Sequence, residues 1–304
     1  MNINQHEKSA KTETHNEIDL LDIFSELWNK KVSITAITSI AAVLSVLYAL
    51  HLPNIFVSSA LLAPADESKS SSGMLGQFSG VANLAGISLG GDSSDKSVEA
   101  IERIRSFDFF SNHFLPEISV QNLTALESWD ASTNTLSYEE DIYNITNDKW
   151  LSSAPSNQRA YKVYTDIMNI SQDKKTLFIS LSIKHKSPHI AKEWTEIIIR
   201  KINSSMRNQD KIQATKSLDF LNNQANKVNY QEIRQAISSL QENQMKSLML
   251  IEANDDYIFK VIDSPIAPEI KSEPKRSLIA MVGTVLGFVI AIFGTIILNL
   301  YRKK

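Results

Sequence analysis

The sequence predicts an α+β membrane protein in which two transmembrane helices flank one large extracytoplasmic α/β domain. Two long uncharged apolar runs lie near the chain ends, and strand-like and helix-like patterns alternate between them. The 304 residues contain no cysteine, and 34 acidic residues nearly balance 31 basic ones. These counts exclude disulfide scaffolds, cysteine-ligated metal sites and thiol catalysis, and they argue against a general nucleic-acid binder.

The two apolar runs, residues 32–52 and 277–301, contain no Asp, Glu, Lys or Arg. At about 1.5 Å rise per residue they reach roughly 31 and 37 Å as helices, enough for a hydrocarbon core of about 30 Å. Basic residues stand just before the first run and just after the second. Because basic flanks favour the cytoplasmic side, we expect residues 1–31 and the tail 302–304 in the cytoplasm.

Small residues recur at every fourth position along both predicted transmembrane helices. Such stripes let helix backbones approach one another closely. We therefore expect six positions to serve transmembrane packing: Ala41, Ser45 and Ala49 in the first helix, and Gly283, Gly287 and Ala291 in the second.

The segments next to the first helix differ strongly in character. Residues 18–28 place apolar side chains at helical spacing opposite acidic ones, which predicts an amphipathic helix at the inner membrane surface. Residues 70–95 hold six of the nine glycines, interleaved with large apolar side chains. A flexible apolar loop needs a covering surface, so we predict a subunit-interface loop around Gly86, Gly90 and Gly91.

Four segments of the domain at residues 53–276 have strand character. We expect 161–170 and 176–185 to form a hairpin, and we expect 54–62 and 257–263, which adjoin the transmembrane helices, to pair with it in one sheet.

A long helix is predicted at about residues 188–228, after an N-cap serine and a first-turn proline. No Gly or Pro interrupts this stretch, which would be roughly 60 Å long. A capping box at Asn229 and Glu232 indicates a second helix after it. Residues at alternating spacings of three and four predict a packing stripe on the long helix: Leu218, Leu221, Ala225 and Val228.

Chemical motifs are weak. Residues 86–90 spell G-x-S-x-G, but they stand in a Gly/Ser-rich loop rather than at the strand-to-helix turn that a nucleophile elbow requires. His185 and His189 are four residues apart across a strand-to-helix junction, where solvated histidines are expected rather than a metal site. The acidic run 139–141 is typical of a solvated face. We predict no catalytic, cofactor-binding or metal-binding residues.

Six stretches together form a recognisable pattern. They are IDLLDIFSELWNKK (18–31), LAGISLGG (84–91), IRSFDFF (104–110), DKKTLFISLSIKHKSPHIAKEW (173–194), IRQAISSLQENQMKSLMLIEANDDYIFKVIDSPIAPE (233–269) and PKR (274–276). The chain thereby resembles the polysaccharide co-polymerase family, in particular the Wzz-type regulators of lipopolysaccharide O-antigen chain length.

The resemblance implies two inner-membrane helices and a periplasmic α/β base domain with a long protruding helix. It also implies a ring-shaped homo-oligomer that contacts membrane lipid and works with the O-antigen polymerase on an undecaprenyl-linked glycan, as a scaffold and without a cofactor. Two other functions stay open. One is a co-polymerase for capsule or exopolysaccharide export, and the other is a periplasmic hydrolase that uses Ser88 or the acidic run 139–141.

Overall fold

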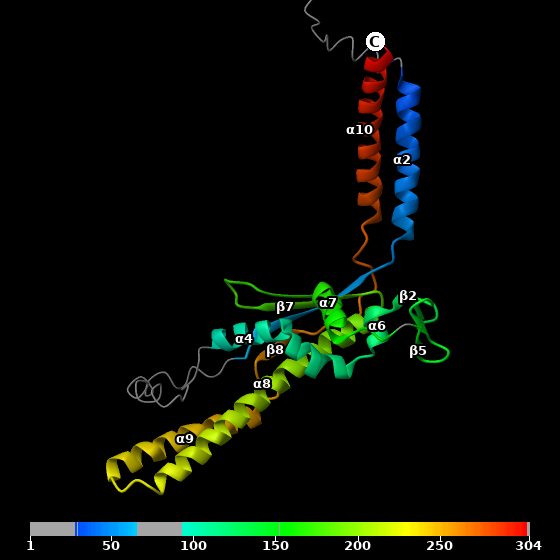
Figure 1. Ribbon diagram of the computed structural model, residues 1–304. Helices are drawn as coiled ribbons and strands as arrows, with labels where there is room; N and C mark the ends of the chain where they lie inside the picture. The colour runs from blue at the N-terminus through cyan, green and yellow to red at the C-terminus, as the bar shows by residue number, and fades with distance from the viewer. Residues whose placement is uncertain (1–27, 29, 66–92, 152, 303–304) are drawn as a thin grey trace, which may run out of the picture. The chain divides into compact units, whose positions relative to one another are not determined.

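The computed structural model describes Trp28 and residues 30–65, 93–151 and 153–302 (Figure 1). It divides into two compact units, one formed by Met1–Leu52 with Pro274–Lys304 and the other by Pro53–Glu273. The first unit is helical and the second combines helices with a β-sheet. The predicted mixed α+β class with two candidate membrane helices is confirmed.

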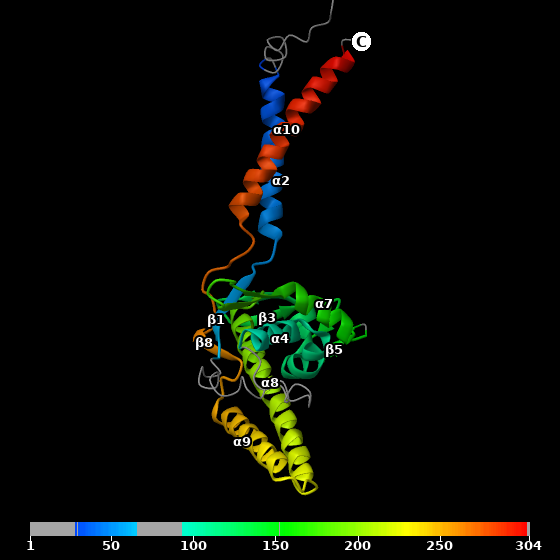
Figure 2. The same cartoon turned by 90° about the vertical axis from the view of Figure 1, so that its left-hand side faces the viewer.

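Two helices, α2 (Lys31–His51) and α10 (Arg276–Arg302), make up the described part of the first unit. They lie side by side (Figures 1 and 2) and make extensive contact. Both are long and apolar enough to cross a membrane, with mean hydropathies of 2.0 and 2.5. Most of their large apolar side chains are exposed, unlike those of a core helix in a soluble protein. The amphipathic helix expected at residues 18–28 lies outside the described residues, apart from Trp28.

The second unit is built on a four-stranded antiparallel sheet in the order β6-β7-β1-β8. Its strands are β6 (Met168–Gln172), β7 (Ile179–His185), β1 (Phe56–Pro64) and β8 (Phe259–Asp263). Strand β1 therefore pairs with β7, and β8 pairs with β1, so both strands that adjoin the candidate membrane helices lie in the sheet of the hairpin, as the sequence predicted. Alternate residues of β7 are buried, which fixes the face that meets the core.

The first arm of the predicted hairpin is wrong over most of its length. Residues Asn157–Ile167 form helix α7, and only the last residues of the arm enter β6. The Ser156 hydroxyl caps this helix by accepting a bond from the Arg159 N–H. Ala160 and Tyr164, four residues apart, are both buried, so helical periodicity decided the outcome.

Short elements complete the second unit. They are α4 (Ser93–Arg105), α5 (Phe107–Phe109), the π-helix η2 (Phe110–Phe114), the 3₁₀ helix η3 (Leu115–Glu117), α6 (Val120–Thr124), and the strand pairs β2 (Leu126–Asp130) with β3 (Thr135–Tyr138) and β4 (Tyr143–Asn144) with β5 (Lys149–Trp150). The core between these helices and the sheet contains an aromatic cluster. The Tyr164 ring lies tilted against those of Phe110 and Phe114, at 5.1 and 5.0 Å between centroids, and Phe114 meets Trp194 edge-on at 5.7 Å.

Helix α8 (Pro188–Ala225) packs against β1 and β7 through its N-terminal half. After Met206 only Ala214 and Leu221 of this helix are buried. There α8 leaves the core and packs along α9 (Gln231–Ala253), which runs back beside it (Figures 1 and 2).

The predicted end of the long helix needs correction. Helix α8 ends at Ala225, so Val228 lies in the connection to α9 and not on the helix. The chain reverses just after Ala225, where the Lys227 N–H donates to the Gln224 carbonyl at 2.9 Å. The predicted capping box at Asn229 is also wrong, because α9 has Tyr230 at its N-cap and no side-chain cap.

A polar triad joins three elements at the point where α8 leaves the core. The Tyr257 hydroxyl donates to Asp210 Oδ2 at 2.5 Å, and Lys96 Nζ lies 3.1 Å from the same oxygen. Burial and the bond to Asp210 raise the pKa of Tyr257, so the hydroxyl keeps its proton. The triad thus links α4, α8 and the segment before β8.

Buried Asn203 of α8 binds the start of β8 through three backbone groups. Its Nδ2 donates to the Phe259 carbonyl at 2.9 Å, while its Oδ1 accepts from the N–H groups of Ile258 and Phe259, each at 2.9 Å. Both the amide oxygen and the amide nitrogen of Asn203 are thereby hydrogen-bonded to β8 or the residue before it.

We expect Asn203→Ala to destabilise the protein by about 3 kcal/mol, because it leaves two N–H groups and one carbonyl unpaired in a buried place. Asn222→Ala is the control, since exposed Asn222 on the same helix makes one exposed bond to Gln241. Urea denaturation of the detergent-solubilised protein measures both. Equal losses from the two variants would contradict this role of Asn203.

His185 is buried where β7 passes into α8, contrary to the expectation of a solvated histidine. Its Nδ1 lies 3.0 Å from the Ser187 N–H, which needs an acceptor, and its Nε2 lies 3.0 Å from the Asn122 carbonyl, which needs a donor. The neutral ring protonated on Nε2 satisfies both partners. Burial lowers the pKa of His185, and neighbouring Lys186 adds to the effect.

Folding stability should therefore decrease at mildly acidic pH. The pKa of His185 in the folded chain lies below the value of about 6.5 for an unfolded chain, so the unfolded chain binds the proton first. The stabilisation is complete above about pH 6.5 and is lost as the pH falls toward the folded value. Thermal melting between pH 7.5 and 5.5 measures it.

His185→Asn should flatten this pH dependence, whereas His189→Asn, a change at an exposed histidine four residues on, should leave it intact. A wild-type curve that His185→Asn leaves unchanged would show that another group is responsible.

Candidate assembly sites

The small-residue stripes of the two candidate membrane helices face one another within the chain. A Cβ atom placed on Gly283 would overlap the Ser45 side chain, and one placed on Gly287 would overlap the Ala41 Cβ. Ala49 and Ala291 are buried as well. The structure thus places all six predicted packing residues where α2 and α10 meet or in buried positions on these helices. The absence of Cβ atoms is what permits this close approach.

Two polar contacts add to the α2–α10 contact. The Ser45 hydroxyl donates to the Ile279 carbonyl at 2.9 Å. The Arg276 guanidinium donates to the carbonyls of Ala49 at 3.0 Å and Leu52 at 3.3 Å, and so satisfies backbone groups at the C-terminal end of α2. Sequence reasoning assigned Arg276 no role beyond its place in the PKR stretch, although a basic residue beside a helix C-terminus is a recognisable signal.

The Gly-rich loop with Gly86, Gly90 and Gly91 lies outside the described residues. The G-x-S-x-G pattern lies outside the described residues too.

The predicted packing stripe of α8 is buried only in part. Leu221 is buried, and Leu218 and Ala225 are half-buried on the same helix. Val228 is half-buried beyond the end of the helix.

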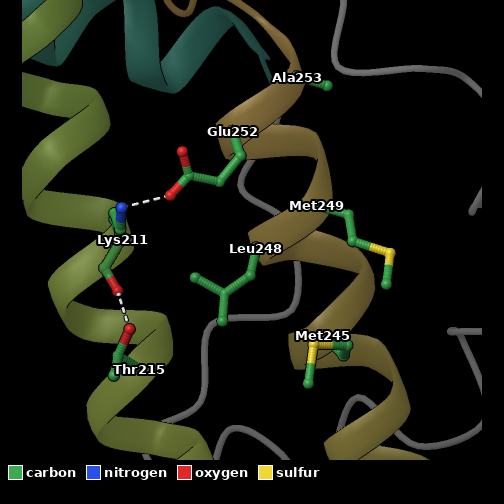
Figure 3. A pocket seen from close by; sticks show the side chains of 7 residues that line it. All are labelled: Lys211, Thr215, Met245, Leu248, Met249, Glu252 and Ala253. Atoms are coloured by element: carbon green, nitrogen blue, oxygen red, sulfur yellow. Dashed lines mark hydrogen bonds and ion pairs between the residues drawn. The ribbon is translucent and has the colours of Figure 1, made fainter.

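A shallow groove of about 540 Å³ lies between α8 and α9 (Figure 3). An ion pair between Lys211 and Glu252 crosses its upper end, and the bond from Lys211 Nζ lowers the pKa of Glu252. Met245 and Met249 reach outward on the α9 side, with Met249 62% exposed. Methionine side chains are flexible and adapt to irregular partner surfaces. The sequence alone did not identify Met245 and Met249, because two apolar residues four apart are common on any helix that packs against another.

Among the described residues, no group of three or more His, Asp or Glu side chains could hold a metal ion. His185 uses both ring nitrogens on backbone partners, and His189 packs its ring 5.8 Å from Trp129. The acidic residues 139–141 are exposed or half-buried.

Residues 16–114 match the family model described as Wzz, chain length determinant protein. The match extends through α2, β1, α4 and η2. The resemblance to the Wzz chain-length-determinant family is therefore confirmed over residues 16–114. No curated protein matches the chain in a sequence search.

Solved structures give weaker similarity. One described as a full-length bacterial polysaccharide co-polymerase has 14% identity and a TM-score of 0.43, covering 94% of this chain and 99% of that chain. A WzzB fragment from Salmonella Typhimurium has 13% identity and a TM-score of 0.31 (72% and 100% covered). A point mutant of the Shigella flexneri O-antigen chain-length regulator WzzB has 13% identity and a TM-score of 0.23, with the same coverage.

Tight packing at Gly287 should make the α2–α10 pair sensitive to a larger side chain. We expect Gly287→Leu to destabilise the detergent-solubilised protein by about 2 kcal/mol, because the added atoms would overlap Ala41. Gly294→Leu on the same helix is the control, since a Cβ there meets no atom within 4 Å. Thermal melting followed by circular dichroism compares them, and equal shifts would contradict a specific contact at Gly287.

Proposed function

We propose that this chain is a non-catalytic, homo-oligomeric scaffold of the bacterial inner membrane that regulates the modal chain length of lipopolysaccharide O-antigen. The family match over residues 16–114 carries the proposal. The two candidate membrane helices supply the anchor, and the second unit supplies a rigid sheet-based body with the α8–α9 pair.

In this proposal residues 53–276 face the periplasm, and residues 1–31 and 302–304 face the cytoplasm. The stripes centred on Ser45 and Gly287 hold the membrane helices together, and the loop around Gly86, Gly90 and Gly91 contacts the neighbouring subunit. Leu218, Leu221 and Ala225 hold α8 to α9, and Val228 supports the turn between them. The partners are further copies of the chain, membrane lipid, the O-antigen polymerase and its undecaprenyl-linked glycan.

Control of glycan length needs geometry more than bond-making chemistry. A polymerase held by a ring of rigid subunits would release its lipid-linked product after a preferred number of additions. The sheet-based core, with its buried apolar cluster and the paired amide of Asn203, provides a rigid element of the required kind, from which α8 and α9 extend.

The banding of lipopolysaccharide on gels tests the proposal. A deletion strain should still make O-antigen but lose the preferred band cluster, and the wild-type gene should restore that cluster. Complementation with Ser88→Ala should also restore it, because the proposed function uses no nucleophile.

Other outcomes would contradict the proposal in different ways. Complete loss of a surface polymer on deletion would favour a capsule or exopolysaccharide export co-polymerase. A Ser88→Ala protein that is present at the normal level, yet lacks a hydrolytic activity that the wild-type protein has, would favour a periplasmic hydrolase.

A further inference from the structure

The segment that follows β8 is held against the start of β1 at two points. Ser58 is buried, with 1% of its surface exposed, and its hydroxyl donates to the Ile266 carbonyl at 2.8 Å. Further along, Ile55 and Glu273 form an isolated antiparallel bridge, with the Ile55 N–H 2.9 Å from the Glu273 carbonyl. Residues 266–273 therefore form a loop that is fixed at both ends, which we call the anchored loop.

The anchored loop presents two isoleucines to solvent. Ile266 is 69% exposed although its own backbone is fixed to Ser58. Ile270 is 81% exposed, more than any other large apolar side chain that the structure describes. Single exposed apolar residues need no explanation, but two in one short fixed loop favour a partner for this loop.

The chain itself limits how far the loop can lie from a membrane. Ile270 precedes Arg276, the first residue of α10, by six positions, which correspond to at most roughly 22 Å of extended chain. Glu273, at the end of the loop, is bonded to Ile55, which follows Leu52, the C-cap residue of α2, by three positions. If these helices cross a bilayer, the loop is confined on two short tethers near its surface.

We propose that Ile266 and Ile270 insert into the interfacial zone of the lipid bilayer. Two side chains are too few for a stable protein–protein interface, which buries at least about 1,000 Å². They suit shallow insertion at the headgroup level, where apolar side chains gain burial beside polar groups.

The charges of the loop are compatible with this location. Lys271 Nζ bonds to Asn54 Oδ1 at 3.0 Å, and Lys275 beside the loop is exposed, so both can lie near anionic headgroups. Two carboxylates belong to the loop: Glu269 is exposed, whereas Glu273 is paired with Lys184 Nζ at 2.6 Å. The inference rests on the membrane topology of the proposed function and not on chain-length regulation.

Fluorescent labelling tests the proposal directly, because the chain has no cysteine and each introduced cysteine is unique. Ile270→Cys is labelled with an environment-sensitive dye, and the full-length protein is placed in vesicles of phosphatidylcholine and phosphatidylglycerol. Ile145→Cys is the matched control, an isoleucine of the second unit that is 63% exposed. Val43→Cys, exposed on α2, reports on the membrane helix itself.

We expect a spin label carried near the top of the lipid acyl chain to quench the dye at position 270 at least about twofold more strongly than at position 145. Equal quenching at the two positions would overturn the proposal. A blue-shifted dye at 270 without lipid quenching would also overturn it, in favour of a protein partner. Quenching at 43 but not at 270 would overturn only this inference, whereas absence of quenching at 43 would overturn the membrane topology as well.

Discussion

The pairing of β1 with β7 on one side and β8 on the other is the interaction on which the rest of the second unit depends. Strand β1 follows the first candidate membrane helix, and β8 leads toward the second, so one ladder joins chain segments some two hundred residues apart. Residues Phe56–Leu62 of β1 pair with β7, and Leu61–Pro64 pair with β8. Strand β1 also holds the anchored loop, through Ser58 and through neighbouring Ile55.

Helix α8 connects this sheet to the two-helix pair that it forms with α9. Its N-terminal half is buried among the sheet and the aromatic cluster, and Asn203 binds it to β8. Beyond Met206 the helix is joined to Lys96 and Tyr257 through Asp210, and it then packs along α9 with Ala214 and Leu221 as its buried residues. One continuous helix thus belongs both to the well-packed base and to the less buried helical pair. After Pro188 it contains no Gly or Pro that would introduce a hinge between them.

The proposed scaffold role requires a protein that acts through shape. The described side-chain clusters are paired internally: Lys96 and Tyr257 with Asp210, Lys211 with Glu252, and His185 with backbone groups. Groups satisfied in this way stabilise a fixed arrangement. A fixed arrangement is what the proposed scaffold requires, and the groove beside Met249 and the anchored loop are two exposed surfaces of the second unit.

Local patterns in the sequence determined much of this structure. The uncharged runs placed both candidate membrane helices, Pro188 marked the start of α8, and strand character near both candidate membrane helices predicted one sheet with β1 inside it. The small-residue spacing identified positions that meet in the α2–α10 contact. Tertiary structure decided the rest: that Tyr164 packs against Phe110 and Phe114, that His185 is buried against the Asn122 carbonyl, and that Arg276 binds the end of α2. Each of these depends on a partner distant in the chain, and periodicity within one segment carries no information about such partners.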